Sequence, residues 1–295
     1  MREEMSFVLL SLFYVITVLL INNHDSLYIS GSSLYNDIIE YADSFDYMPI
    51  NARCDKVWYK VPGVDGLEVN VNESYNNMDE FDLNKIIYNE LKHEIDIYDL
   101  ECGPIYRGHE ESKSATLIIN VAWGEEYLNN ILDTLDIYDT KANFFFEGRF
   151  AEKFPELVYD TYSRGHTIGN HSYSHPDLAK SSLNKIKYEI SKTNNVLSEI
   201  TLDGIRFFGP PSGSYDNRVI EAASELGLET IMWSVDTIDW QKPSKEMIIK
   251  RVSSKLHAGA IILMHPTENT CTALPEIINL IKKNYKIEQL DDFLS

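Results

Sequence analysis

From Ala115 to the end of the chain, short apolar runs alternate with longer mixed segments, and this alternation constrains the fold more than any other feature. The apolar runs predict strands over residues 115–123, 142–148, 166–171, 205–211, 230–236 and 260–266. The intervening segments predict helices over residues 125–138, 155–165, 182–200, 217–228, 244–256 and 273–284. About seven such alternations predict an α/β fold in which helical crossovers join parallel strands, as either a barrel or an open sheet.

The residues before this region divide into three parts. Met5–Ile21 is an apolar run without a charge, so we expect residues 1–24 to be an uncleaved membrane anchor. A cleaved signal peptide and a buried core helix are the alternatives. Residues 25–45 are polar and predict a stalk, and residues 46–110 predict a small α+β module. The α/β domain, residues 111–295, is then expected outside the cytoplasmic membrane, either anchored or secreted.

The charge balance limits the classes of partner. A formal net charge of −20 argues against nucleic acid, because nucleic-acid binding needs clustered Lys and Arg. An acidic protein tolerates neutral or cationic polymers such as amino sugars.

Three cysteines, Cys54, Cys102 and Cys271, occur without any C-x-x-C motif, so neither a cysteine-based zinc site nor a thiol redox motif is expected. We interpret them as three buried, unpaired thiols. Pairing of Cys54 with Cys102 is the alternative that the sequence leaves open.

Residues that could carry chemistry fall just beyond the predicted strands. His171 and His175 are four residues apart, which would place both on one helix face and suit a single metal ion. His265 directly follows another strand, and the run "WSVDTIDW" ends at Asp239 and Trp240. Each signal alone is ambiguous, but in α/β folds the active site lies at the carboxyl ends of the strands. Their shared position therefore predicts a functional site.

The motifs "NVAWG", "HSYSH", "FFGPPSG", "WSVDTIDW" and "LMHP", in this order, resemble the five motifs of polysaccharide deacetylase domains of the NodB-homology, carbohydrate esterase family 4 type. The chain is also similar to the sporulation-associated, YlxY-like branch of that family. The resemblance implies a distorted (β/α)₇ barrel that binds zinc or a similar divalent ion. It also implies removal of acetyl groups from N-acetylated glycans such as peptidoglycan. Residues 46–110 loosely resemble small modules proposed to bind peptidoglycan in YoaR- and VanW-like envelope proteins.

The resemblance also implies roles for individual residues. His171 and His175 match two metal ligands, His265 matches the general acid, and Asp239 matches the carboxylate that orients it. On the substrate side, Trp240 and Leu263 match the wall of the acetyl pocket, and Ser212 matches a position whose backbone amide helps to form the oxyanion hole.

Three positions depart from the family pattern. The general base is replaced by Ala122, which cannot take a proton, and the third metal ligand is replaced by Trp123, which cannot bind a metal. The Arg that holds the base is replaced by Gly209. Any divalent metal, with zinc the first candidate, would therefore be held weakly.

Two hypotheses follow from these departures. The first is a hydrolase in which Glu125, Glu126 or Asp236 substitutes for the missing carboxylates. The second is a pseudoenzyme whose groove binds glycan, or a morphogenetic partner, without turning it over. The coherent loss of the base together with its Arg favours the second hypothesis.

Overall fold

The computed structural model describes residues 33–45 and 47–295. The predicted anchor, Met5–Ile21, lies outside the described residues. Within the described part of the chain, no helix is both long and apolar enough to cross a bilayer.

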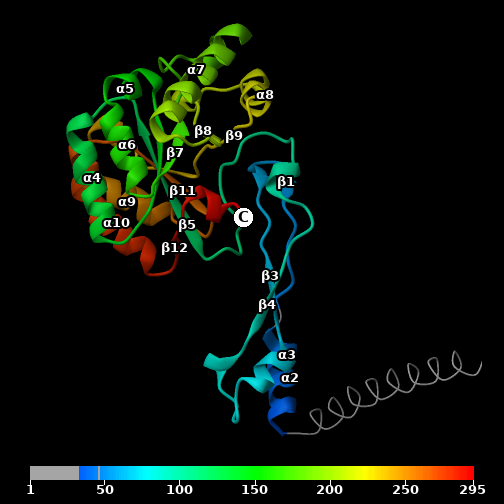
Figure 1. The fold of residues 1–295 in the computed structure, drawn as a ribbon. Helices are drawn as coiled ribbons and strands as arrows, with labels where there is room; N and C mark the ends of the chain where they lie inside the picture. Colours follow the sequence, from blue (N-terminus) through cyan, green and yellow to red (C-terminus); the bar gives the residue numbers. More distant parts are fainter. Residues whose placement is uncertain (1–32, 46) are drawn as a thin grey trace, which may run out of the picture. The chain divides into compact units, whose positions relative to one another are not determined.

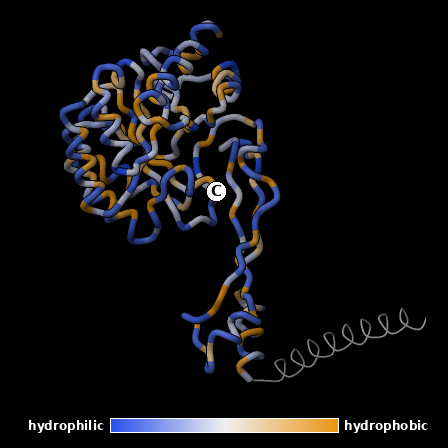
Figure 2. Tube along the Cα trace, viewed as in Figure 1, coloured by the Kyte–Doolittle hydropathy of each residue, from blue (hydrophilic) through white to orange (hydrophobic). Residues whose placement is uncertain are grey.

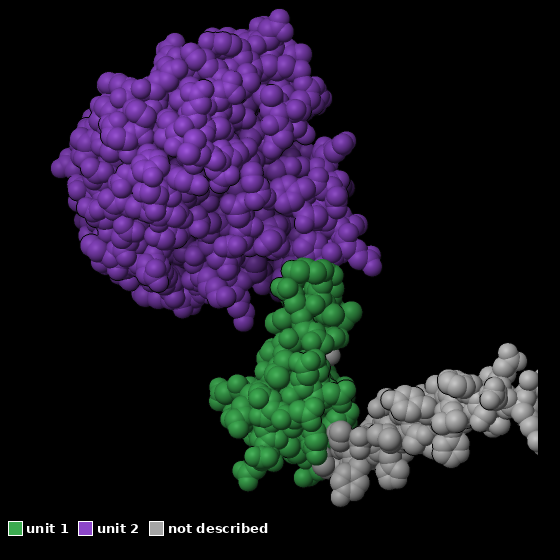
Figure 3. Space-filling view, viewed as in Figure 1, with its two compact units in different colours: residues 1–50, 65–92 green, residues 51–64, 93–295 purple. Residues whose placement is uncertain are grey.

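The chain forms two compact units, which Figure 3 distinguishes by colour. Among the described residues, the first unit comprises residues 33–45, 47–50 and 65–92, and the second comprises residues 51–64 and 93–295. This division cuts through the predicted module at 46–110, because two of its segments pack with the α/β domain.

The first unit has a small core of its own. Helix α2 (Ser33–Phe45) occupies part of the segment that we expected to be a polar stalk, and it buries Ile38 and Ala42. The helix forms because these apolar side chains recur at four-residue spacing and share one face. The other elements are α3 (Val71–Asn76) and the antiparallel pair β3 (Gly66–Val69) and β4 (Tyr88–Leu91).

The second unit is built on one parallel sheet (Figure 1). Its strands are β5 (Ser114–Val121), β6 (Asn143–Phe146), β7 (Thr167–Asn170), β8 (Phe207–Phe208), β9 (Glu229–Thr230), β10 (Val235–Asp236), β11 (Ala260–Met264) and β12 (Lys286–Ile287). Their order is β10-β11-β5-β6-β7-β8-β9, with β12 pairing with the start of β5. The predicted α/β fold, a distorted barrel of parallel strands, is confirmed.

The single strand predicted over 230–236 is in fact two strands at opposite ends of the sheet. β9 pairs with β8, whereas β10 pairs with β11. The intervening residues cross the open side of the barrel: Met232 N–H donates to Ile105 O (2.7 Å) and Ser234 N–H donates to Ile261 O (3.1 Å). An apolar run does not show where a chain changes its partner, so the sequence predicted one element.

Side-chain alternation along the strands gives the sheet two different faces. The outer face packs against helices α4 (Glu125–Ile137), α5 (Gly148–Lys153), α6 (Pro155–Ser163), α9 (Lys245–Lys255) and α10 (Glu268–Lys282). Helices α7 (Leu183–Thr201) and α8 (Asn217–Glu225) share a further apolar cluster, and α11 (Leu290–Phe293) follows β12. Figure 2 shows the hydrophobic segments running through the interior of this unit. The inner face, which includes Ile118, Phe145 and Leu263, is filled by apolar side chains below the site.

Cys54 and Cys102 form a disulfide, with Cα atoms 6.0 Å apart and a sequence separation of 48. The interpretation of three unpaired thiols was therefore wrong for two of the three, while Cys271 is free and half-buried. Cys54 lies in β1 (Arg53–Asp55), which pairs with β2 (Tyr59–Val61) in a hairpin. The sequence alone could not show this contact, because the two cysteines are 48 residues apart and become neighbours only in the folded chain.

Replacing both Cys54 and Cys102 by Ser should lower the free energy of unfolding of the second unit by about 2–4 kcal/mol, because the cross-link restricts the unfolded chain. Urea unfolding of the oxidised full chain measures the change. Cys271→Ser is the matched control and should leave the unfolding midpoint near that of the unsubstituted chain. Equal midpoints for the double variant and the control would contradict the prediction.

Candidate functional site

His171 and His175 lie in a loop that begins where β7 ends. The expectation that they share a helix face is wrong, because the loop contains left-handed residues at Ser172 (φ 62°) and His175 (φ 53°). Glu189 on α7 holds the loop by accepting from Ser174 N–H and Ser174 Oγ–H, both at 2.7 Å. The loop still brings the two imidazole rings within 5.0 Å of each other, centroid to centroid.

His171 is buried, and its imidazole is fixed by one hydrogen bond. Its Nδ1 lies 2.7 Å from Gly209 O, and since a carbonyl oxygen can only accept, Nδ1 carries the proton. Burial, and next the proximity of His175, lower the pKa of His171 to about 3. At neutral pH the ring is therefore uncharged, with an unprotonated Nε2.

His265 follows β11 directly and is oriented by a buried carboxylate. Its Nδ1 lies 2.7 Å from Asp239 Oδ1, and its backbone N–H donates to Asp239 Oδ2 at 2.7 Å. Thr270 Oγ1–H donates to the same Oδ2 at 2.7 Å. Asp239 is fully buried, and these donors offset the cost of burying its charge. The structure thus pairs the two residues expected to act as acid and orienting group.

The end of β5 carries no carboxylate. Ala122 and Trp123 occupy the turn between β5 and α4, and the Trp123 indole is 44% exposed. Its ring is parallel to the imidazole of His265, with an interplanar angle of 4° and centroids 6.0 Å apart. The indole thus stands beside the expected acid, at the position where the family pattern has a metal-binding carboxylate.

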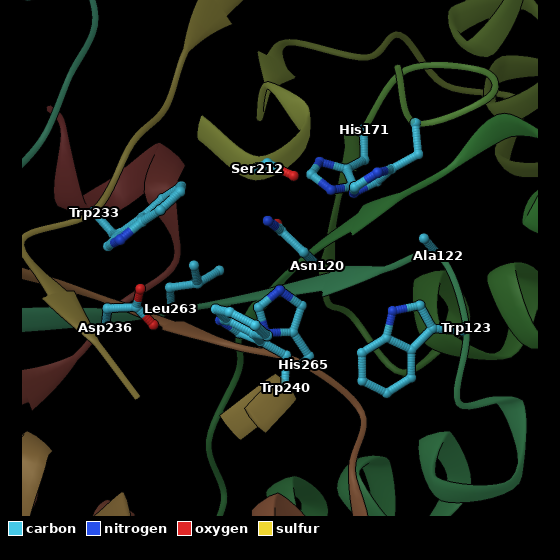
Figure 4. A pocket seen from close by; sticks show the side chains of 11 residues that line it. Asn120, Ala122, Trp123, His171, Ser212, Trp233, Asp236, Trp240, Leu263 and His265 are labelled. Atoms are coloured by element: carbon cyan, nitrogen blue, oxygen red, sulfur yellow. The ribbon is translucent and has the colours of Figure 1, made fainter. Parts of the chain in front are cut away.

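These residues line one pocket of about 400 Å³. Figure 4 shows His171 and His265 on opposite sides of it, with Asn120 between them. The lining residues are Asn120, Ala122, Trp123, His171, His175, Ser212, Trp233, Asp236, Trp240, Leu263 and His265.

Nine of the thirteen residues singled out from the sequence line this pocket, and the other four are Gly209, Asp239, Glu125 and Glu126. Trp240 and Leu263 lie on the His265 side, where Leu263 is buried and Trp240 is half-exposed. Ser212 lies on the rim with a left-handed backbone (φ 54°). Gly209 sits behind His171 as its hydrogen-bond acceptor, and Asp239 lies behind His265. The roles that the resemblance implies for these residues stay predictions.

The side chains at the metal position do not fit a zinc ion. Zinc sites use three or four protein ligands, whereas only His171 and His175 offer donors here, because an indole does not bind zinc. The described residues include no cluster of three or more His, Cys, Asp or Glu side chains that could hold a metal.

The acidic side chains considered as substitutes lie elsewhere. Glu125 and Glu126 are in the first turn of α4 and do not line the pocket; Glu125 lies 3.8 Å from Lys153. Their charges there interact favourably with the helix dipole. Asp236 does line the pocket, beside Trp233, and its Oδ1 accepts from Ile238 N–H at 2.7 Å. It belongs to the wall of the pocket that lies opposite His171.

Sequence reasoning missed several residues of the site. Asn120 interrupts the apolar run of β5, and that polar break was a signal that could have been used. Trp233 lies in the crossing segment between β9 and β10, which was expected to be a strand. Glu189 and Thr270 act through hydrogen bonds from distant helices, and no local pattern indicates them.

Residues 107–231 match the family described as polysaccharide deacetylase. Over 269 residues the chain is 39% identical to the uncharacterized protein YlxY of Bacillus subtilis, covering 90% of this chain and 84% of the relative. The chain belongs to the polysaccharide deacetylase family. This is the carbohydrate esterase family 4 to which its motifs pointed.

Two further relatives of the family bear on function. The structure of BA3943 from Bacillus anthracis, described as a CE4 family pseudoenzyme, matches with a TM-score of 0.86 and 39% identity, covering 90% of this chain and 95% of that chain. A BA3943 mutant is described as having restored enzymatic activity. The peptidoglycan-N-acetylmuramic acid deacetylase PdaA of B. subtilis is 30% identical over 64% of this chain and 74% of its own.

Stability should fall as the pH drops from about 6.5 towards 4, in part because of His171. Its pKa in the folded state lies below the ordinary value, so the unfolded chain takes up a proton that the folded chain does not. The contribution of His171 to the free energy of unfolding is fully present above pH 6.5. As the pH falls below that value, the free energy of unfolding decreases by at most about 1.4 kcal/mol per pH unit. In urea unfolding with chelator, His171→Gln should flatten the profile in this window. Identical slopes for the variant and the unsubstituted chain would contradict this assignment.

Proposed function

We propose that this polysaccharide deacetylase-family protein is a pseudoenzyme that binds N-acetylated glycan, such as peptidoglycan, without hydrolysing it. One observation carries the proposal: Ala122 and Trp123 line the pocket directly after the carboxyl end of β5, at the positions that the motif resemblance matches to the base and a metal ligand. General base catalysis alone contributes about 10²–10⁴-fold to a rate, and the metal supplies the activated water. A site without either has no means of forming the nucleophile.

The side of the pocket around His265 supports the proposal that the protein still binds a ligand. His265, held from behind by Asp239, faces the same pocket as the buried Leu263 and the aromatic rings of Trp233 and Trp240. Concave pockets with apolar and aromatic walls and a few convergent polar groups are typical of small-ligand sites. Relatives named as peptidoglycan deacetylases support an N-acetylated glycan as the ligand class.

We place the protein at the cell envelope, outside the cytoplasmic membrane. The Cys54–Cys102 disulfide supports this location, since disulfides persist in oxidising compartments and are rare in the cytosol. The apolar run Met5–Ile21 supports an N-terminal membrane attachment. The sporulation setting implied by the sequence resemblance, and peptidoglycan binding by the N-terminal module, remain predictions.

The full chain, purified without chelator, should contain substoichiometric zinc and release no acetate from N-acetylglucosamine oligomers. Trp123→Asp should gain stoichiometric zinc, because a carboxylate joins His171 and His175. Ala122→Asp is the matched control: it adds a carboxylate at the base position and should leave the zinc content unchanged. Atomic absorption gives the metal content, and an acetate assay gives the activity.

The double variant Ala122→Asp/Trp123→Asp tests whether the remaining site is catalytically competent, as restored activity in the BA3943 mutant suggests by analogy. We expect measurable acetate release that chelator abolishes. Gly209→Arg is left out of this variant, although the family pattern has an Arg there. A Cβ at position 209 would approach Cδ1 of Phe145 to 3.0 Å, so the Phe145 ring would have to shift. Chelator-sensitive deacetylation by the unsubstituted chain would overturn the pseudoenzyme proposal.

A further inference from the structure

Asn120 is a polar residue on a strand whose other residues are mostly apolar. It is the penultimate residue of β5, and it shares the inner face of the sheet with Thr116 and Ile118 because alternate residues point the same way. Its side chain points into the pocket between His171 and His265 (Figure 4). Asn120 as a whole is only 5% exposed.

The carboxamide oxygen of Asn120 has no hydrogen-bond partner in the described part of the chain. Its Oδ1 is buried and accepts from no donor among the described residues. Burying such a group without a partner costs about 1–3 kcal/mol. An apolar residue at this position would avoid that cost, so the amide needs another explanation than the stability of the fold.

Two other buried asparagines on neighbouring strands show what a structural amide looks like in this fold. Asn143 on β6 donates to Thr116 Oγ1 and Leu117 O, both at 2.8 Å, and accepts from Leu290 N–H at 2.8 Å. Asn170 on β7 is similarly bonded, donating to Ile190 O (2.8 Å) and accepting from Ser172 N–H (2.8 Å). Both tie the sheet to other elements. Asn120 makes no comparable tie and faces the pocket instead.

The neighbours of Asn120 determine which ligand group it suits. The Nδ1 of His171 is engaged with Gly209 O at 2.7 Å and so is not available to a ligand. The Nδ2–H₂ of Asn120, which lines the same pocket, is a donor for a ligand carbonyl. Leu263 lies beside it in the same pocket and offers apolar surface for a methyl group.

We propose that Asn120 is a specificity-determining residue, and that it recognises the acetamide of an N-acetylated sugar by donating to its carbonyl oxygen. This inference rests on the proposed function, namely that the pocket binds glycan. Because the site lacks the third metal ligand, the Asn120 side chain, and not a metal ion, would contact the carbonyl oxygen of the acetamide. A deacetylated sugar offers an ammonium group without an acceptor, so it leaves Nδ2–H₂ unpaired and binds less tightly.

Isothermal titration calorimetry of the full chain, in the presence of chelator, tests this inference with two probes. One is the tetramer of N-acetylglucosamine, and the other is the fully deacetylated glucosamine tetramer. Asn120→Leu keeps the approximate shape and removes both hydrogen-bonding groups. Asn129→Leu, at an exposed position on α4, is the matched control.

The unsubstituted chain should bind the acetylated tetramer more tightly than the deacetylated one. Asn120→Leu should weaken binding of the acetylated tetramer about tenfold, the effect of one lost hydrogen bond, and should reduce the preference accordingly. Asn120→Asp exchanges the donor for a carboxylate and should shift the preference towards the glucosamine tetramer. Asn129→Leu should change neither affinity.

Thermal unfolding separates recognition from a structural role. Asn120→Leu should keep or raise the melting temperature, because it removes an unpaired buried amide. A lowered melting temperature with unchanged glycan preference would overturn the inference and make Asn120 structural. If the unsubstituted chain binds the tetramers equally, the inference fails while the proposed function stands. If it binds neither tetramer nor peptidoglycan fragments, the proposed function itself fails.

Discussion

The parallel pairing of β5 with β6 on one side and β11 on the other determines where Asn120, Trp123 and His265 enter the site. In this register Val121 is opposite Phe146, and Met264 is opposite Ile119, so the three strands end at the same edge. Side chains of the last two residues of these strands, and of the residues that directly follow them, therefore lie close to one another. A slip by one residue would turn Asn120 towards the helices and the neighbouring apolar side chain into the pocket.

The pocket has a buried carboxyl group behind one wall and uncharged side chains at the end of β5. Asp239 is buried with three hydrogen bonds from His265 and Thr270, which stabilise it without any metal. Across the pocket, the Nδ1 of His171 is bonded to Gly209 O, and Ala122 and Trp123 carry no charge. Contacts among the described residues therefore hold both His265 and His171 in place without an ion.

Much of the fold and part of the site could be predicted from the sequence, because periodicity and the motifs are local properties. The long strand β5 and the helix α7 gave clear patterns, and His171, His175 and His265 fell at strand ends. What depends on non-local contacts could not be predicted.

The change of partner strand between β9 and β10 is one such case, and the disulfide is another. The loop that holds His175 depends on Glu189. Only the folded chain shows that no donor among residues 33–45 and 47–295 reaches Asn120 Oδ1, whereas Asn143 and Asn170 are bonded.

The position of the Cys54–Cys102 disulfide has a consequence for the fate of the protein after cleavage by a protease. The chain leaves the second unit after Val64 and returns at His93, so the cross-link closes a covalent ring that contains residues 65–92 of the first unit. A single nick within that ring breaks the backbone but leaves both fragments joined through sulfur. At the envelope location proposed above, the pocket would stay tethered to the N-terminal part of the chain until a reductant released it.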